Sequence, residues 1–234
     1  MILNNKILKF RYLLQTLNSL NKISTFVQVG AHDGLMHDPL YFLLKKNKWS
    51  GIIIEPQIEM LNLFKKRYIN RDNLIYANVA VHSKKKKIQL YTVKNPSNYS
   101  QTGWASFYHR HIPKKNKEMK VIDVKAMPLM AIIQKSKFKN IDLLQIDTEG
   151  FDYEVLNMFN FDLYKPFIIQ YEHIHLSTKD YLKSIKLLEN NGYYCIRGKN
   201  DTISIRKDIV SIKFISSYFF LRLSASLKSR LYIK

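Results

Sequence analysis

The stretch TFVQVGAHDG, at residues 25–34, is where the fold of this chain can first be recognised. A mostly apolar run leads directly into a turn that begins at Gly30, as expected where a buried strand ends in a sharp change of direction. A glycine at the end of a strand also lets a ligand approach the backbone closely. Such turns are common in α/β proteins, so the stretch gains its meaning from the segments around it.

Similar apolar runs recur along the chain and predict further strands. They cover residues 51–56, 74–81, 87–93, 141–147 and 166–172. Segments with helical spacing lie between several of them, as at Leu61, Phe64 and Tyr68. Apolar strands that alternate with helices predict a parallel sheet with helices on both faces. Two runs at 193–198 and 202–207 predict an antiparallel hairpin that closes this α/β sheet.

Length and composition favour a single domain with a packed core. The chain has 234 residues, of which 46% are apolar, and Cys195 is its only cysteine. One cysteine excludes a disulfide framework and indicates a reducing compartment, so we expect a cytoplasmic protein. No run approaches the roughly 18 apolar residues of a membrane-spanning helix. We divide the chain into an amphipathic N-terminal helix (1–24), a folded domain (25–208) and a C-terminal tail (209–234).

The net charge of +20 allows nucleic acid or anionic lipid as a partner. However, the basic residues are scattered, apart from the run 84–87, and scattered charge is typical of a solvated surface. The basic, apolar tail 209–234 suits a helix that contacts a membrane surface, or one that packs on the domain. The loop 94–117 is long and rich in aromatic residues, Trp104 among them, and predicts a cover for a substrate.

An acid follows the second predicted strand at Glu55–Pro56, one strand–helix–strand step after the turn at Gly30. A carboxylate in this place can accept hydrogen bonds from both hydroxyls of a ribose. The lysine of a phosphate-binding loop and the third glycine of a dinucleotide fold are both missing. The pattern therefore favours an adenosine ligand that carries no pyrophosphate.

Acids and histidines gather after two later strands. Asp147 and Glu149 follow the run 141–147, and Glu172, His173 and His175 come at the end of the run 166–172 or just after it. Open α/β sheets place their ligands at the carboxyl ends of strands. Carboxylates and imidazoles there suit the removal of a proton from a hydroxyl, and we name Asp147, Glu149, Glu172 and His173 as catalytic candidates. A divalent cation held by the same groups is the alternative, although we assign no metal ligand.

Five segments of the chain resemble the FkbM-type methyltransferases in their order and spacing. They are VGAHDG, WSGIIIEPQ, NVAV, IDLLQIDTEGFDYEVL and PFIIQYEHIHLS. The resemblance implies a Rossmann-like class I methyltransferase fold with a seven-stranded sheet and S-adenosylmethionine as cofactor. It further implies methylation of a hydroxyl on a sugar, a glycan or a secondary metabolite.

Carried over by residue, the resemblance places Gly30 and Gly34 at the methionine moiety, with Ala31 and Asp33 in the same turn. It places Glu55 at the ribose with Pro56 beside it, and Asn78 or Ala80 near the adenine. Asp147 would lie where the methyl donor meets the acceptor. His32 departs from the family pattern, in which many members carry asparagine.

Two other functions compete with a small-molecule or glycan acceptor. The positive charge would suit an RNA methyltransferase that acts on the ribose hydroxyl. The second competing function is that of a binding protein that keeps the fold without turnover. The presence of Gly30, Glu55 and Asp147 together argues against it. The sequence leaves the oligomeric state open.

Overall fold

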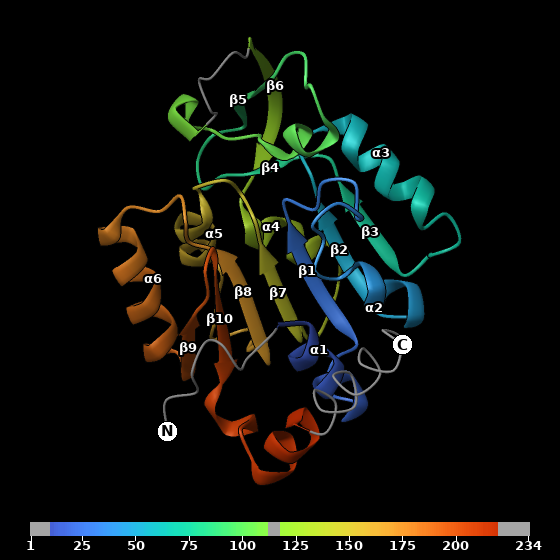
Figure 1. Ribbon diagram of the computed structural model, residues 1–234, viewed down its shortest axis with the longest axis vertical. Coiled ribbons are helices and arrows are strands. Elements are labelled where there is room, and N and C mark those ends of the chain that lie inside the picture. The colour runs from blue at the N-terminus through green and yellow to red at the C-terminus, as the bar shows by residue number, and fades with distance from the viewer. Residues whose placement is uncertain (1–9, 112–117, 220–234) are drawn as a thin grey trace, which may run out of the picture.

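A computed structural model describes residues 10–111 and 118–219 of the chain. At its centre lies a seven-stranded sheet in the order β3-β2-β1-β7-β8-β10-β9 (Figure 1). The strands are β1 (Thr25–Val29), β2 (Ser50–Ile54), β3 (Leu74–Ala77), β7 (Leu143–Ile146), β8 (Ile168–Glu172), β9 (Tyr193–Arg197) and β10 (Asp201–Arg206). The five strands from β3 to β8 run parallel, and β10 is antiparallel to both of its neighbours. The predicted parallel sheet with a closing hairpin is confirmed.

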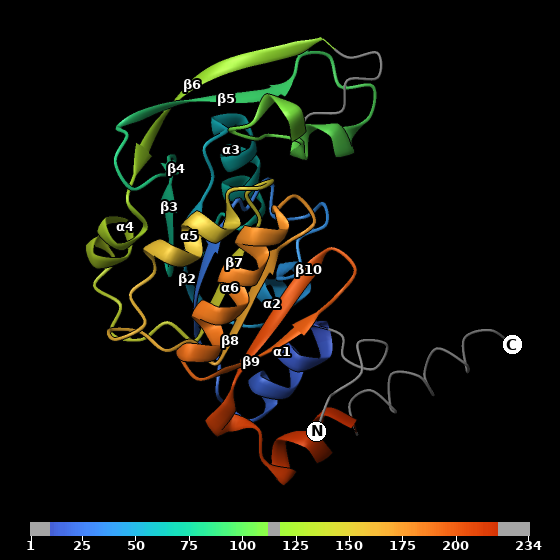
Figure 2. The same cartoon turned by 90° about the vertical axis from the view of Figure 1, so that its left-hand side faces the viewer.

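Helices cover both faces of this sheet, as the apolar strands require. One face carries α1 (Phe10–Ser19), α2 (Tyr41–Lys46) and α3 (Ile58–Arg67). The other carries α4 (Leu129–Lys135), α5 (Asp152–Met158) and α6 (Thr178–Asn190), which lie side by side in Figure 2. Side chains alternate along each strand, so Phe26 packs in the first core and Val27 in the second.

A second, smaller sheet stands above the carboxyl ends of the parallel strands (Figures 1 and 2). It contains β4 (Ala80–Val81), β5 (Lys87–Val93) and β6 (Met119–Met127) in the order β4-β6-β5. The predicted strand 74–81 is thus two strands in different sheets. The sequence reasoning missed β6, because its exposed face carries charged residues such as Lys120, Asp123 and Lys125.

The predicted loop 94–117 connects β5 to β6. Its described part holds two short 3-10 helices, η1 (Tyr99–Gly103) and η2 (His109–His111). A backbone bridge joins Ser106 to Tyr91 of β5, so this segment is fastened to the small sheet. We call residues 99–111 the aromatic loop.

The first and the last described helical segments pack against the same core cluster. α1 buries Leu13, Leu14 and Leu17 there. After η3 (Lys207–Ile209), residues 212–219 are helical, and Phe214 and Tyr218 join this cluster. The parts of the predicted N-terminal helix and tail at 1–9 and 220–234 lie outside the described residues. Among the described helices, none has both the length and the apolar character needed to cross a bilayer.

Candidate active site

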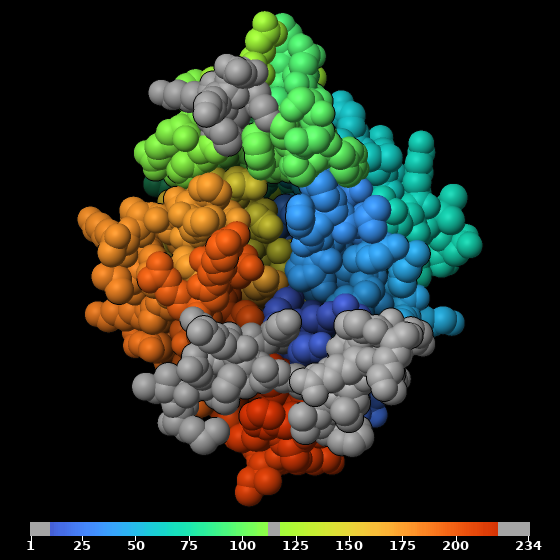
Figure 3. Space-filling view, viewed as in Figure 1, coloured from blue at the N-terminus to red at the C-terminus, as the bar shows by residue number. Residues whose placement is uncertain are grey.

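A cavity of about 310 Å³ lies where the carboxyl ends of β1, β2 and β7 meet the small sheet and the aromatic loop. In the space-filling view a hollow is visible where the blue, green and olive segments meet (Figure 3). Five of the residues predicted to bind the cofactor line the cavity, namely Gly30, Ala31, Glu55, Pro56 and Ala80. Two of the predicted catalytic residues, Asp147 and Glu149, line it as well. Trp104 of the aromatic loop forms part of the opposite wall.

Gly30 lets β1 and β7 approach each other closely at the floor of the cavity. Its φ of 76° lies in the left-handed region, which favours glycine. A Cβ atom at this position would collide with the carbonyl oxygen of Asp147. The glycine is therefore required by the backbone of the adjacent strand, besides any ligand above it.

Glu55 lies at the end of β2 with only 4% of its surface exposed. Its two carboxylate oxygens accept hydrogen bonds from the backbone N–H groups of His32 (2.9 Å) and Gln57 (2.8 Å). Burial raises the pKa of Glu55 to about 7, although both backbone hydrogen bonds lower it. Each oxygen can accept a further hydrogen bond, so the carboxylate can meet two ligand hydroxyls in the cavity.

Asp33, Gly34 and Asn78 do not line this cavity, so their predicted contacts with a cofactor find no support in the geometry. Asn78 donates hydrogen bonds to the carbonyl oxygens of Glu55 and Pro56 and thereby holds the loop after β2. A Cβ atom on Gly34 would meet the Phe64 ring, so this glycine serves the packing of α3.

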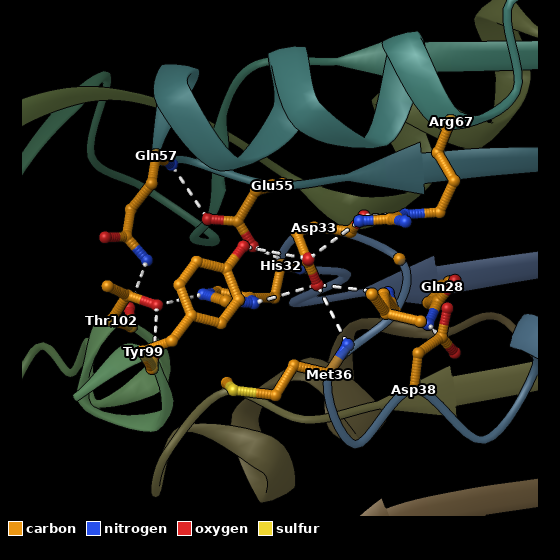
Figure 4. Close-up of polar contacts among 12 residues, drawn as sticks. Gln28, His32, Asp33, Met36, Asp38, Glu55, Gln57, Arg67, Tyr99 and Thr102 are labelled. Atoms are coloured by element: carbon orange, nitrogen blue, oxygen red, sulfur yellow. Dashed lines mark hydrogen bonds and ion pairs between the residues drawn. The ribbon is translucent and has the colours of Figure 1, made fainter.

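The Asp33 carboxylate instead joins three parts of the fold (Figure 4). It accepts hydrogen bonds from the amides of Leu35 and Met36, from the Tyr99 hydroxyl (2.8 Å) and from Arg67 of α3 (3.1 Å). Burial alone would raise the pKa of Asp33, but the hydrogen bonds from the Met36 and Leu35 amides and from the Tyr99 hydroxyl lower it to about 2. Asp33 therefore holds the turn after β1, helix α3 and the aromatic loop together.

A second link from this turn to the aromatic loop runs through His32, the position that departs from the family pattern. Its Nε2 lies 2.9 Å from the hydroxyl of Thr102, and its backbone N–H holds Glu55. Gln57 donates to the Thr102 carbonyl oxygen at 3.3 Å. Figure 4 shows these groups converging on η1. The aromatic loop is thus anchored to the same residues that position Glu55.

At the other end of the cavity, carboxylates from β7 and β8 come together with an imidazole. His175 Nε2 lies 3.1 Å from a carboxylate oxygen of Glu149 and 3.8 Å from one of Glu172. Asp147 and Glu149 line the cavity, whereas Glu172 and His175 lie behind Glu149. We call Asp147, Glu149, Glu172 and His175 the acid–histidine group.

His173 is not part of this group, contrary to the predicted convergence. Its ring is buried beside β10, where Nδ1 lies 3.0 Å from the Thr202 hydroxyl and Nε2 accepts a hydrogen bond from Arg197 (3.3 Å). Burial lowers the pKa of His173, and the positive charge of Arg197 lowers it further. Glu172 and His173 are successive residues at the end of an extended strand, so their side chains point to opposite sides. A turn follows, closed by the Leu176 amide on the His173 carbonyl oxygen, and His175 in this turn points back toward Glu149.

Asp152 organises the backbone beneath the group. It is fully buried and accepts hydrogen bonds from the Thr148 hydroxyl (2.9 Å) and from the amides of Gly150 and Glu172. These contacts join the end of β7 to the end of β8. Burial raises the pKa of Asp152 to about 7.

The acid–histidine group has more negative charge than positive partners. Burial strongly raises the pKa of Asp147 and of Glu172, and the neighbouring carboxylates raise both further. The hydrogen bond to Glu149 raises the pKa of His175. Among the described residues, no lysine or arginine forms an ion pair with these carboxylates. Such an arrangement favours the binding of a cation or the uptake of protons.

Three of these residues have a spacing that a metal ion can use. One ligand atom each from Glu149, Glu172 and His175 lie within 4.8 Å of one another. Carboxylate oxygen and imidazole nitrogen together suit several divalent metals.

The aromatic loop also reaches this end of the cavity. The Ser106 hydroxyl donates to the carbonyl oxygen of Glu149 (2.7 Å), and His111 Nδ1 lies 2.8 Å from the same oxygen. The His111 ring stacks on the ring of His175 at 5.2 Å. The loop therefore contacts two residues that line the cavity, His32 and Glu149.

Comparison with known proteins assigns the family. The model of the methyltransferase FkbM domain matches residues 28–195, which include every residue that lines the cavity. The chain belongs to the FkbM methyltransferase family. A comparison with curated proteins gave no match.

Among solved structures, the methyltransferase FkbM from Methylobacillus flagellatus KT is similar to this FkbM chain with a TM-score of 0.50 and 14% identity, over 79% of this chain and 44% of that one. The chain thus spans less than half of that protein. The fibrillarin pre-rRNA processing protein of Methanococcus jannaschii matches with a TM-score of 0.42, 11% identity and coverages of 80% and 67%. Precorrin-6y C5,15-methyltransferase from Geobacter metallireducens GS-15 matches with a TM-score of 0.39 and 11% identity, over 88% of this chain and 94% of that one. At 14% identity the likeness to the first structure concerns the fold.

Other residues of the FkbM cavity were not found from the sequence. Gln28 and Gln145 line it from inside their strands, and Asp38 lines it from the loop before α2. A polar residue within an otherwise apolar strand was the available signal for both glutamines. Asp38 gave no such signal, because an acid in a loop is ordinary.

Proposed function

We propose that this chain is an S-adenosylmethionine-dependent methyltransferase that transfers the methyl group to a hydroxyl of a sugar, a glycan or a similar small metabolite. One observation carries the proposal. The Glu149–His175 pair lies beside the same cavity whose other end holds Glu55, with its backbone-supported carboxylate. A place for a ribose and a place for a base thus share one space.

The residues that line the cavity fit the proposed cofactor. Glu55 would hold the ribose hydroxyls, and Gly30 with Ala31 leaves room for the chain that follows. Apolar side chains of Val79 and Val81 line the part near the predicted adenine position. When bound, S-adenosylmethionine supplies a methyl group on a positively charged sulfur, which is reactive enough to need no enzyme nucleophile.

Glu149 is the proposed base. A hydroxyl has a pKa far above neutrality, so its proton must leave during or before its attack on the methyl group. Glu149 lines the cavity and can accept this proton, and its hydrogen bond to His175 gives the proton a second acceptor. His175 is 33% exposed, so it can release the proton to water. Asp147, beside Glu149 in the cavity wall, would orient the acceptor.

The aromatic loop would cover the acceptor and exclude water. It contacts the cavity-lining residues His32 and Glu149, and its own Trp104 also lines the cavity. Covers of this kind commonly control access to active sites. Among the described residues, no lysine or arginine pairs with the carboxyl groups at the reacting end, so this end offers no positive charge to the phosphates of RNA and favours a neutral hydroxyl compound.

Calorimetry with S-adenosylhomocysteine tests the cofactor half of the proposal. Glu55→Ala should weaken binding by about 1.5–3 kcal/mol, as expected for hydrogen bonds to a charged group. Glu59→Ala, an exposed acid in the first turn of α3, is the matched control and should bind as the wild type does. Unchanged affinity in Glu55→Ala would contradict the proposed contact between Glu55 and the ribose.

A screen for S-adenosylhomocysteine release over sugars, glycans, hydroxylated metabolites and RNA tests the acceptor half. We expect turnover with a hydroxyl compound, and mass spectrometry of the product should place the new methyl group on oxygen. Methylation of a nitrogen or carbon atom, or turnover with RNA alone, would contradict the proposal.

A further inference from the structure

Three buried acceptor oxygens in the cavity have no hydrogen-bond donor. They are Oε1 of Gln28, Oε1 of Gln145 and Oδ2 of Asp38, and none has a hydrogen-bond partner among the described residues. Gln28 is 2% exposed and Gln145 is 3% exposed, and both line the cavity, as Asp38 does. Buried polar atoms are nearly always paired in folded proteins, so this set points to a ligand that supplies donors.

The side chains of Gln28 and Gln145 lie next to each other on one face of the sheet. The two residues are directly paired in register between β1 and β7. Adjacent strands are about 4.8 Å apart, so one small group can reach both side chains. Gly30, two residues after Gln28, lines the same cavity.

Asp38 fixes which atom Gln28 presents. The Nε2 of Gln28 donates to Oδ1 of Asp38 at 3.0 Å, and the same oxygen accepts from the Leu40 amide (Figure 4). A carboxylate only accepts, so the amide of Gln28 must turn its nitrogen to Asp38 and keep its oxygen free. In the described part of the chain, Asp38 forms no ion pair with a lysine or arginine.

We infer that Gln28, Asp38 and Gln145 form a subsite for a primary ammonium group. Three acceptor oxygens and one negative charge match the three N–H donors and the positive charge of an ammonium. A hydroxyl offers one donor, and a water molecule offers two and no charge, so either leaves part of the set unpaired. The ammonium comes from the amino-acid part of the methyl donor or from an amine on the acceptor; the first source rests on the proposed function.

Calorimetry with three nucleosides tests the first source. S-Adenosylhomocysteine carries the ammonium, its deaminated analogue carries a keto group instead, and 5′-methylthioadenosine lacks the whole amino-acid part. The wild type should bind S-adenosylhomocysteine roughly 10-fold or more tightly than the deaminated analogue. Gln145→Met keeps the size of the side chain and removes the acceptor. It should lose this preference while its affinity for 5′-methylthioadenosine stays unchanged.

Gln170→Met is the matched control. Gln170 pairs with Gln145 in register on β8, is buried and also has an unpartnered Oε1, but it does not line the cavity. This variant should keep the wild-type preference for the ammonium. If Gln145→Met weakens all three nucleosides equally, or if Gln170→Met has the same effect as Gln145→Met, the subsite is overturned as the source of recognition.

Saturation-transfer NMR with glucosamine and glucose, at saturating S-adenosylhomocysteine, tests the second source. Binding of glucosamine alone, lost in Gln145→Met, would place an acceptor amine in the subsite. If the wild type binds none of the nucleosides, the proposed function fails, and the glucosamine measurement without added nucleoside then decides the subsite. No preference for an ammonium in either measurement would overturn the inference.

Discussion

Asp33 and the acids of the acid–histidine group lie at the same edge of the sheet, the first buried and the others half-buried, and they differ in the donors around them. Asp33 receives four hydrogen bonds from its surroundings, one of them from Arg67, and its pKa falls to about 2. The carboxylates of the acid–histidine group have His175 as their one ionic partner among the described residues, and the pKa of Asp147 is raised well above its ordinary value.

The difference separates structural acids from acids that can take part in chemistry. A carboxylate whose oxygens are filled by protein donors has no capacity left for a ligand, so Asp33 stabilises the fold. A carboxylate that faces a cavity without donors keeps its lone pairs for a ligand or a proton. The sequence offered both kinds of acid at strand ends, and only the surrounding donors distinguish them.

Replacing an acid by its amide should lower turnover in the acid–histidine group and stability at Asp33. The effect on turnover should be the larger. Glu149→Gln should lower turnover by about 10²–10⁴-fold, the usual contribution of a positioned base. Affinity for S-adenosylhomocysteine should stay within a few-fold. The free energy of unfolding should stay nearly unchanged, because the Glu149 side chain is partly exposed and accepts no hydrogen bond from a backbone amide of the described residues. Near-normal turnover would show that the base lies elsewhere.

Asp33→Asn should instead act on stability. Removing one partner from a buried, hydrogen-bonded pair costs about 3 kcal/mol, because Arg67 and the Tyr99 hydroxyl lose their acceptor. Urea unfolding at pH 7 would measure this loss, with the exposed Asp72→Asn as a control that should leave stability unchanged. A stable Asp33→Asn protein with reduced turnover would reverse our assignment of the two groups.

The sequence predicted the fold better than the site, for physical reasons. Long apolar strands and the turn at Gly30 are local patterns, so the parallel sheet, its closing hairpin and the position of Glu55 followed from them. Which side chain of the segment after β8 turns toward Glu149 depends on how the chain bends there. His173 and His175 could not be distinguished by spacing, and the hydrogen bonds of His173 to Thr202 and Arg197 come from distant strands.

Part of the small sheet could not be predicted from the sequence for a similar reason. β6 has charged residues on its exposed face and pairs with β5 across the aromatic loop. Alternating polar and apolar residues over a short run carry less signal than an unbroken apolar run. The glutamines within β1 and β7 were visible as polar residues in apolar strands, but their unpaired oxygens became apparent only with the cavity.

Three buried carboxylates should also make stability depend on pH. Burial raises the pKa of Asp38 to about 6 and those of Glu55 and Asp152 to about 7. Above the unfolded value of about 4, the folded chain then binds more protons than the unfolded chain, so stability falls as the pH rises from 4 through 7. Each group contributes on the order of 2–4 kcal/mol to this loss.

Urea unfolding of the ligand-free protein at pH 5, 6, 7 and 8 would measure this slope. Asp38→Asn should flatten it between pH 5 and 6, since asparagine does not titrate and its side-chain oxygen can still accept from Gln28 and Leu40. Asp72→Asn should keep the wild-type slope. Stability that increases from pH 5 to pH 8 would contradict the raised pKa values.

The smallest expected effect concerns the pKa of His175. It tests whether His175 and Glu149 interact at the reacting end of the cavity. The hydrogen bond to Glu149 raises the pKa of His175 above the ordinary value of 6.5, whereas burial and Arg197 lower the pKa of His173. NMR titration of the two ring signals should therefore show His173 losing its proton at lower pH than His175. In Glu149→Gln the pKa of His175 should fall, because the neutral amide no longer stabilises the imidazolium, and the pKa of His173 should stay unchanged. If both values moved together, or if neither moved, His175 would not be coupled to Glu149 in solution, and the second proton acceptor of the proposed base would be lost.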